Sequence, residues 1–401
     1  MDQFDVVIVG GGAAGFFSAI NLAEMRPDLR IVVLEQSKEA LSKVRISGGG
    51  RCNVTHACFD PKTLTEYYPR GQKELLGPFH KFDCKSTLAW FEERGVALKI
   101  EDDGRVFPTS DDSASIVNCL LKRAKTLNVQ VRYHSKVKNF HPYGNGWKIE
   151  ISETIINANH LVITTGSSPF IWNILKTLGH QIVEAVPSLF TFHCTDARIK
   201  GLQGLSLPYV TLKISGSTIE TEGPILITHS GLSGPAVLKA SAWGALFLSK
   251  LKYQFSIIID WMPGVSEEEI GSLKSVMGIK SVFSNALYNV PTRLWKSLVL
   301  SSNITESTRW ADMSKDQSLA LIQNLKNCSL EIHGKSTFKE EFVTAGGVDL
   351  KEVDFKNFKS KLMPNLYLAG EVINVDAVTG GFNFQAAWTG GYLIAHGIAQ
   401  S

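Results

Sequence analysis

Phe4-Asp-Val-Val-Ile-Val-Gly10-Gly11-Gly12-Ala13-Ala14-Gly15 is the stretch that decides the fold of this chain. It reads as an apolar strand, a glycine-rich turn and the beginning of a helix. Gly10 allows the tight turn, Gly12 lets a phosphate approach the backbone, and Gly15 lets the helix pack closely on the strand. The helix N-terminus then offers unpaired N–H groups and partial positive charge to an anion. The stretch therefore predicts a site for the pyrophosphate of a dinucleotide.

An acidic residue follows where such a site needs one. Glu35 ends the next apolar strand, 31–34, and lies twenty residues after Gly15. A carboxylate there accepts hydrogen bonds from ribose hydroxyls and repels a 2′-phosphate. The alternative is a glycine turn in some other α/β unit, but the order of strand, helix and acid favours dinucleotide binding.

Length and composition describe an ordinary globular protein. The chain has 401 residues, of which 44% are hydrophobic and 20% charged, so we expect two compact units. A net charge of +3 gives no argument for nucleic acid or a membrane as the main partner. The six cysteines form no CxxC pair, which is typical of free thiols in a reducing, cytoplasmic compartment. The N-terminus does not read as a signal peptide, and the histidines show no metal spacing, so no metal is expected.

The end of the chain repeats the pattern of its beginning. Residues 366–371 read as a strand that runs into a glycine-acid turn, and 379–385 leads into a helix predicted over 386–395. The C-terminal segment is therefore expected to rejoin the N-terminal nucleotide domain, with the middle of the chain inserted as a second unit. Elsewhere the hydrophobic pattern predicts helices over 86–93 and 113–127 and strands over 129–133, 147–151, 161–165, 225–229 and 254–259.

Three more glycine-rich turns stand at 47–53, 344–348 and 379–383. Such turns let the backbone pass close to a flat ligand and aim N–H donors at it. Each can instead be only a tight connection. Three of them in a chain with a dinucleotide fingerprint favour a large cofactor laid along several loops.

With these motifs the chain resembles a family of bacterial flavoproteins, the BaiN-like NAD(P)/FAD-dependent oxidoreductases, some of which are labelled aminoacetone oxidase-like. The resemblance runs in order over nearly the whole chain and rests on Lys43-Val-Arg-Ile-Ser-Gly-Gly-Gly-Arg-Cys-Asn53, Thr228-His-Ser-Gly-Leu-Ser-Gly-Pro-Ala-Val-Leu238, Thr344-Ala-Gly-Gly-Val348, Leu366-Tyr-Leu-Ala-Gly-Glu-Val372 and Thr379-Gly-Gly-Phe-Asn-Phe-Gln385. It implies the cofactor FAD and an α/β fold: a glutathione-reductase-type, Rossmann-like FAD-binding domain with an inserted small β-barrel plus helices. The expected bounds are 1–189 and 336–401 for the FAD-binding domain and 190–335 for the insert.

The resemblance also implies which residues bind the cofactor. The pyrophosphate would be held by Gly10, Gly12, Ala13, Ala14 and Gly15, with Lys43 as a nearby counter-charge, and the adenosine ribose by Glu35 with Gln36 beside it. The loop of Ser47, Gly48, Gly49, Gly50, Arg51, Cys52 and Asn53 would run beside the ribityl chain and the isoalloxazine. Val137 would meet adenine, and Thr165, Gly166, Gly370 and Glu371 would pass the cofactor closely. Gly381, Phe382 and Asn383 would start a helix that points at the N1–C2=O edge of the flavin, where its N-terminus would stabilise the reduced form.

The chain departs from the family pattern in three places. Gly166-Ser-Ser-Pro169 lacks a longer loop that family members commonly have after this strand, so a substrate is not carried over from them. His56 stands where the family often has asparagine, and Asn374 stands where it often has aspartate.

Three residues near these motifs have two interpretations each. Cys52 is either a redox thiol or a packed loop thiol, and it has no partner at CxxC spacing. Arg51 either binds a substrate anion or nicotinamide phosphate, or ties its own loop together. His229 either faces the flavin or is a hydrogen-bonded structural histidine. The stretch 231–235 has proline where a nucleophile elbow needs glycine, which excludes a serine hydrolase of that kind.

We expect an FAD-dependent oxidoreductase that transfers hydride through flavin N5 and acts on a small-molecule substrate. NADH or NADPH would be a transient co-substrate, because no second GxGxxG follows. The alternatives are an FAD-dependent amine oxidase that uses oxygen, a flavin-carrying module that docks on RNA or protein, and a nucleotide-binding protein without turnover. The near-neutral charge argues against RNA. No catalytic acid or base is assigned, and the sequence leaves the substrate and the oligomeric state open.

Overall fold

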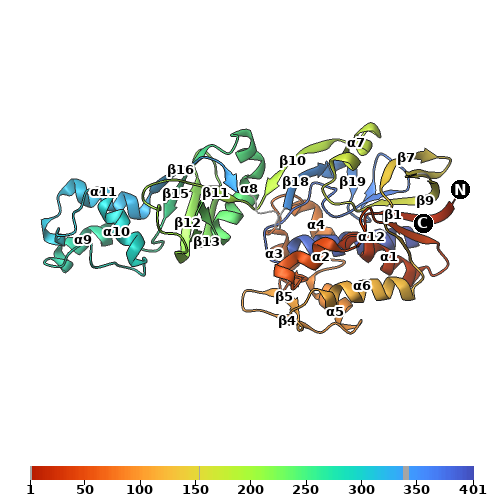
Figure 1. Ribbon diagram of the computed structural model, residues 1–401, viewed down its shortest axis with the longest axis horizontal. Helices are drawn as coiled ribbons and strands as arrows, with labels where there is room; N and C mark the ends of the chain where they lie inside the picture. The colour runs from red at the N-terminus through yellow and green to blue at the C-terminus, as the bar shows by residue number, and fades with distance from the viewer. Residues whose placement is uncertain (1, 153, 337–342) are drawn as a thin grey trace. The chain divides into compact units, whose positions relative to one another are not determined.

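The computed structural model describes residues 2–152, 154–336 and 343–401 (Figure 1). They form two compact units, of which the first comprises Met1–Val186 and Val343–Ser401 and the second comprises Pro187–Phe342. Relative to the expected bounds, the first segment ends at 186 rather than 189, and the last begins at 343 rather than 336. Within the described ranges, no helix is both long and apolar enough to cross a membrane.

The first unit is built on a parallel sheet with the strand order β21-β9-β1-β2-β6. Its strands are β1 (Asp2–Val9), β2 (Ile31–Leu34), β6 (Gln130–Arg132), β9 (Thr154–Ile163) and β21 (Leu366–Leu368). In β1 the run from Val6 to Val9 is buried at every position, as expected for a parallel strand that is covered on both faces. Antiparallel additions flank it: β7 (Val137–Tyr143) and β8 (Gly146–Ile151) continue from β9, and β19 (Val353–Asp354) and β20 (Lys359–Ser360) continue from β21.

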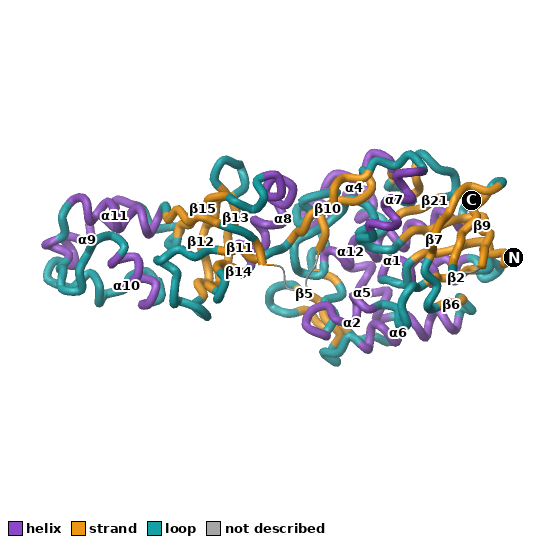
Figure 2. Tube along the Cα trace, turned by 45° about the horizontal axis from the view of Figure 1, so that its top comes forward, coloured by secondary structure: helices purple, strands orange, loops and turns teal. Residues whose placement is uncertain are grey.

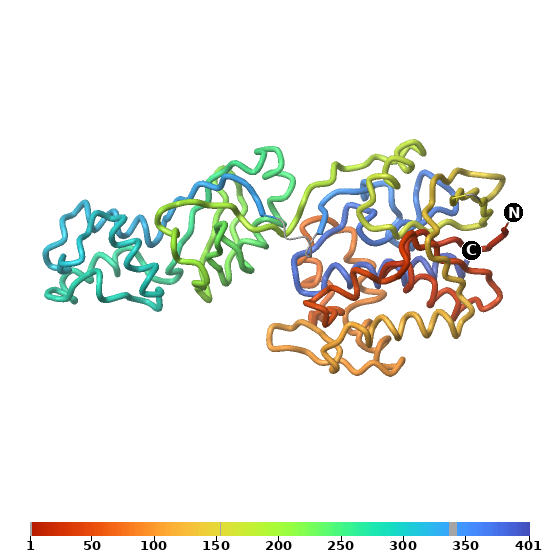
Figure 3. Tube along the Cα trace, in the orientation of Figure 1, coloured from red at the N-terminus to blue at the C-terminus, as the bar shows by residue number. Residues whose placement is uncertain are grey.

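Two helices from opposite ends of the chain pack together in this unit. These are α1 (Ala13–Met25) and α12 (Phe382–Ala399) (Figures 1 and 2). A Cβ on Gly391 would lie 2.8 Å from the Ala14 carbonyl oxygen, so glycine is what permits this close approach. The C-terminal segment therefore completes the domain that the N-terminal segment begins, as Figure 3 shows by colour.

Smaller elements surround this framework. The helices are α2 (Ser42–Ile46), α3 (Pro61–Thr65), α4 (Gln72–Phe79), α5 (Cys84–Glu92), α6 (Ala114–Thr126) and α7 (Pro169–Thr177), with 3₁₀ turns at Ser47–Gly50 and Leu350–Glu352. A three-stranded sheet has the order β3 (Thr55–His56), β5 (Arg105–Pro108), β4 (Leu98–Ile100), and β10 (Ile182–Ser188) pairs with β18 (Val343–Val348). The helix expected over 86–93 begins two residues earlier, because the Asp83 carboxylate accepts the Ser86 N–H at 2.8 Å and caps it.

The second unit holds the expected small barrel. Its antiparallel strands run in the order β16 (Cys328–Ile332), β15 (Phe255–Asp260), β12 (Ser206–Ile214), β13 (Glu220–Ile227), β14 (Gly231–Ser233), β11 (Thr191–His193) and β17 (Lys335–Ser336). Only His333 and Gly334 separate β16 from β17, so one bent segment pairs with β15 at one end and with β11 at the other. His193 bonds both intervening residues at 3.0 Å. The sheet therefore closes on itself.

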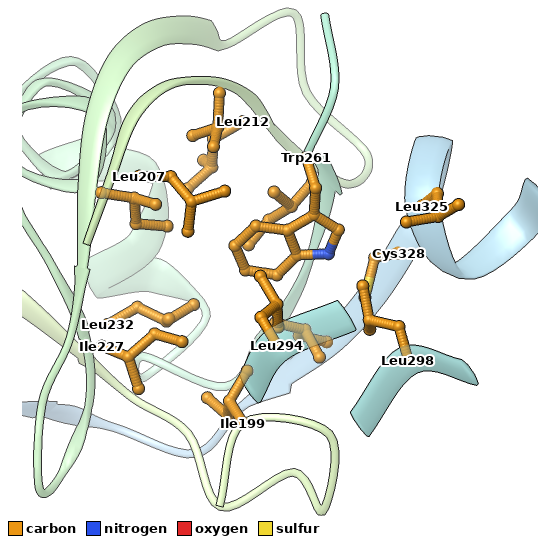
Figure 4. Packing of buried hydrophobic residues seen from close by; sticks show 14 of the residues in the cluster. Ile199, Leu207, Leu212, Ile227, Leu232, Trp261, Leu294, Leu298, Leu325 and Cys328 are labelled. Atoms are coloured by element: carbon orange, nitrogen blue, oxygen red, sulfur yellow. The ribbon is translucent and has the colours of Figure 1, made fainter. Parts of the chain in front are cut away.

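One core joins the barrel to its helices. The helices are α8 (Pro235–Lys250), α9 (Glu267–Met277), α10 (Thr292–Leu300) and α11 (Lys315–Lys326), with a 3₁₀ turn at Trp310–Asp312. Along β13 every second residue is buried, which is the period of a strand with one covered face. Leu207 and Leu212 of the barrel lie in one cluster with Trp261 and with Leu294 and Leu298 of α10 (Figure 4). The barrel and the helices are thus parts of one hydrophobic core.

Candidate functional site

The glycines of the first turn have separate tasks. Gly10 has φ +108°, and a Cβ there would lie 2.5 Å from the Thr164 carbonyl oxygen. A Cβ on Gly15 would lie 2.1 Å from the Gly10 carbonyl oxygen. Gly12 differs, because a Cβ there would meet no atom within 4 Å. Gly10 and Gly15 are therefore required by the backbone, whereas Gly12 borders open space.

That open space fits a phosphate group. Gly12 is the N-cap of α1, whose first turn has neither a capping side chain nor an acidic residue, so its N–H groups face the space. Nearby, the Thr165 hydroxyl is buried and has no hydrogen-bond partner among the described residues. The Thr164 hydroxyl donates to the Gly10 carbonyl at 2.9 Å and holds the turn. The residues present thus fit the pyrophosphate of FAD, with Ala13 and Ala14 in the first helical turn.

Glu35 is fixed beside this turn. Its Oε2 accepts the Gly11 N–H at 2.9 Å, and its Oε1 accepts the Ser37 N–H at 2.8 Å. The carboxylate keeps further lone pairs for ribose hydroxyls. The Glu35 carbonyl accepts the Ser135 N–H at 2.8 Å, which brings the beginning of β7, with buried Val137, close to Glu35. Gln36 is exposed.

Three distant segments meet at the next part of the predicted site. Lys43 forms an ion pair with Glu371, and a Cβ on Gly166 would lie 3.4 Å from Glu371 Oε2. Gly370 precedes this acid in a left-handed conformation, with φ +77°. Lys43 is predicted as a counter-charge to the pyrophosphate, and in the structure its ammonium pairs with the Glu371 carboxylate.

The loop at 47–50 presents bare backbone. Gly48, Gly49 and Gly50 all have left-handed φ values, 58°, 69° and 86°, which only glycine adopts in succession without strain. A Cβ at Gly49 or Gly50 would meet nothing within 4 Å. The Ser47 hydroxyl donates to the Val44 carbonyl at 2.9 Å and anchors the loop. A flat ligand can therefore approach the backbone here.

The Arg51 side chain contacts the neighbouring hairpin. Its guanidinium lies 3.9 Å from the Phe107 ring centroid and donates to Glu101 at 2.7 Å. The side chain fixes the loop to the β4–β5 hairpin. These contacts fit the second of the two interpretations, in which Arg51 ties its own loop together.

Cys52 is a packed thiol. It is completely buried, and burial raises the pKa of the thiol to about 12. Because the thiolate is the reactive form and only about one Cys52 thiol in ten thousand is ionised at pH 8, Cys52 should react slowly. We expect Ellman's reagent at pH 8 to modify the partly exposed Cys58 and Cys119 first, and Cys52→Ser to keep its flavin. Rapid labelling of Cys52 in the folded protein, with Cys58→Ser as the control for assignment, would contradict this account.

The helix at the predicted flavin edge starts earlier than expected. The sequence predicts 386–395, whereas α12 runs from Phe382 to Ala399 with Gly381 as its N-cap. A Cβ on Gly381 would lie 2.5 Å from the Thr55 carbonyl oxygen, so the helix begins in close contact with β3. Both polar atoms of the Asn383 side-chain amide are hydrogen-bonded within the protein. The amide forms two 3.0 Å bonds with the Ala377 backbone, as donor and as acceptor, and fixes the entry to the helix.

Of the remaining predicted residues and departures, Asn53 and His56 lie at this helix start. The Asn53 amide nitrogen donates to the Thr55 carbonyl, and the amide oxygen accepts the Gly381 N–H at 2.9 Å. The Phe382 ring is stacked at 4.7 Å on His56. Asn374 accepts the Gly346 N–H at 3.0 Å, so the amide keeps the acceptor that an aspartate would provide. His229, in the second unit, is exposed.

Sequence reasoning missed a buried polar network that anchors α12. Gln385 Oε1 accepts from the hydroxyls of Thr55 at 2.6 Å and Thr87 at 2.8 Å, and Nε2 donates to the Thr389 hydroxyl at 3.1 Å. All four residues are buried. The signal in the sequence is a glutamine inside an otherwise apolar helix. The described residues hold no group of three or more side chains suited to a metal ion.

The whole chain is similar in sequence to known proteins. The family model described as HI0933-like protein Rossmann domain matches residues 4–397. Ribosomal RNA dihydrouridine synthase of Escherichia coli (strain K12) is 28% identical, over 99% of this chain and 98% of that protein. The 3-dehydro-bile acid delta(4,6)-reductase of Clostridium scindens is 25% identical, over 98% of each.

A solved structure shares the fold. The 3-ketosteroid-Δ4-(5α)-dehydrogenase of Rhodococcus jostii RHA1, in complex with 4-androstene-3,17-dione, aligns with a TM-score of 0.54 at 12% identity. The alignment covers 100% of this chain and 97% of that one. At this identity the likeness concerns the fold alone.

Proposed function

The chain belongs to the HI0933-like Rossmann-domain family and is an FAD-dependent oxidoreductase, and on that premise we propose that it reduces a carbon–carbon double bond conjugated to a carbonyl group. When bound, FAD would supply the hydride through N5. NADH or NADPH would supply electrons as a transient co-substrate. The six cysteines, all free thiols, support a reducing, cytoplasmic location.

The substrate class follows from chemistry that two relatives share. The Escherichia coli relative is named for dihydrouridine, the product of reducing the uracil double bond beside a carbonyl. The Clostridium scindens relative is named for reduction of a bile acid with a 3-oxo group and double bonds at positions 4 and 6. Reduction of such a bond by a reduced flavin would add a hydride to the carbon that the carbonyl makes electrophilic and a proton to its neighbour.

The open space at Gly12 is the observation that supports FAD binding by this chain, on which the proposed reaction depends. It lies between two glycines that the fold requires, and it faces the uncapped N-terminus of α1. Glu35 would bind the ribose, and the loop at 47–50 would let a flat ring approach the backbone. The N–H groups of Phe382 and Asn383, in the first turn of α12, would face negative charge that accumulates on a reduced flavin. The chain's own residues would thus bind and orient the cofactor and favour its reduced state.

Anaerobic mixing tests this function. The purified yellow protein is given NADH, then NADPH, and the flavin band at about 450 nm is followed. We expect one nicotinamide to bleach the band and a conjugated enone to restore it without oxygen. Bleaching by amines but by neither nicotinamide would instead support the amine oxidase alternative.

RNA is a second candidate substrate, because the Escherichia coli relative aligns over 99% of this chain. The reduced protein would be incubated with ribosomal RNA, and nucleosides that gain two hydrogens would be measured by mass spectrometry. Formation of dihydrouridine, with binding that weakens steeply as salt increases, would favour RNA over a small molecule. With a net charge of only +3, we expect the small molecule.

A further inference from the structure

A buried ion pair holds the loop that leads into α12. Asp376 is completely buried, the Arg70 side chain is 10% exposed, and the guanidinium donates through Nε and Nη2 to both carboxylate oxygens. A bidentate pair of this kind fixes orientation as well as charge. Burial removes water from both ions, so a buried ion pair is weak evidence that the pair stabilises the fold. Its position before α12 indicates a second role.

The surrounding contacts connect the ion pair to the start of α12. The Val378 N–H donates to the Tyr67 carbonyl at 3.0 Å, so the segment before Arg70 runs beside the loop. Ala377, which follows Asp376, is held on both sides by the Asn383 side chain at 3.0 Å. A displacement of Asp376 is therefore transmitted to the first turn of α12.

Asp376 also carries charge. The N-terminus of α12 has a partial positive charge, and a carboxylate five residues before Gly381 opposes it. In a low-dielectric interior, a carboxylate acts more strongly on its surroundings when a cation that pairs with it is removed. We propose that Arg70 is a positioning residue that neutralises Asp376 and so preserves the positive field of α12 at the flavin. This inference rests on the proposed FAD site.

Midpoint potentials of the bound flavin test the inference without any substrate. Arg70→Met removes the cation that faces Asp376, and we expect the potential to shift to more negative values and FAD retention to fall about tenfold. Asp376→Asn should shift the potential in the positive direction. The double variant removes both charges, and its potential should return close to that of the wild type.

Controls separate charge from folding. Arg26→Met breaks an exposed ion pair with Asp28 at the C-terminal end of α1 and should leave the potential unchanged. Arg70→Lys keeps the charge but not the bidentate geometry, so it should lower thermal stability while the potential stays near the wild-type value. If Arg70→Met does not fold, the midpoint potential of Asp376→Asn alone tests the inference.

Two results would overturn the inference. One is a wild-type potential in Asp376→Asn, and the other is a double variant whose potential is shifted further than that of either single variant. A wild-type protein that binds no FAD would instead contradict the proposed function, before any potential is measured. Failure of the inference and failure of the function are therefore distinguishable.

Discussion

Gly12→Val should give a folded protein that purifies without colour. Gly12 has φ −92°, which any residue adopts, and its Cβ direction is open, so valine fits the protein itself. The side chain would fill the space that we assign to the pyrophosphate. We expect the Kd for FAD to rise at least about a hundredfold, equivalent to about 2.8 kcal/mol. Equilibrium dialysis against FAD measures this, and thermal unfolding should show a loss of at most about 1 kcal/mol from the N-cap.

The neighbouring glycine provides the contrast. Gly10→Ala forces a Cβ against the Thr164 backbone at φ +108°, so it should destabilise the fold itself. Gly77→Val is the control for replacing a glycine by valine. Gly77 lies at an exposed helix position with open space around it, so this variant should keep its full flavin content. If Gly12→Val binds FAD as tightly as the wild type, the pyrophosphate lies elsewhere.

Gln385→Leu should cause a large loss of stability. Leucine has a similar volume but leaves the buried hydroxyls of Thr55 and Thr87 without their acceptor. We expect a loss of about 3 kcal/mol in the free energy of unfolding. In a domain of this size that lowers Tm by about 6–12 °C, which differential scanning calorimetry measures.

An exposed glutamine serves as the matched control. Gln72→Leu in α4 should change stability by no more than about 0.5 kcal/mol. If Gln385→Leu melts within about 2 °C of the wild type, the buried network does not anchor α12.

Features determined by local sequence could be predicted. The strand, turn and helix around Gly10 depend on residues within one βαβ unit, and the match over 4–397 confirms the family prediction. The hydrophobic pattern predicted the start of α12 too late, because Gly380, Gly381 and Asn383 read as a turn, whereas the family resemblance implied the start at Gly381 to Asn383 that the structure has. Asn383 instead bonds the backbone of Ala377, and the helix extends to Phe382.

Features that depend on distant partners could not be predicted. The sequence left two interpretations of Arg51, because Glu101 and Phe107 lie about fifty residues further along the chain. The closure of the barrel depends on a two-residue bend between β16 and β17, which has no marker stronger than one glycine. Burial decides the chemistry of Cys52, and burial is a property of the folded protein.

The central claim is that segments from both ends of the chain together bind one FAD. The most direct measurement saturates the folded protein with FAD, removes the excess by gel filtration, denatures the sample and quantifies the released flavin by chromatography. The account predicts one FAD per chain. A protein that is folded by circular dichroism and releases no FAD after saturation would contradict it.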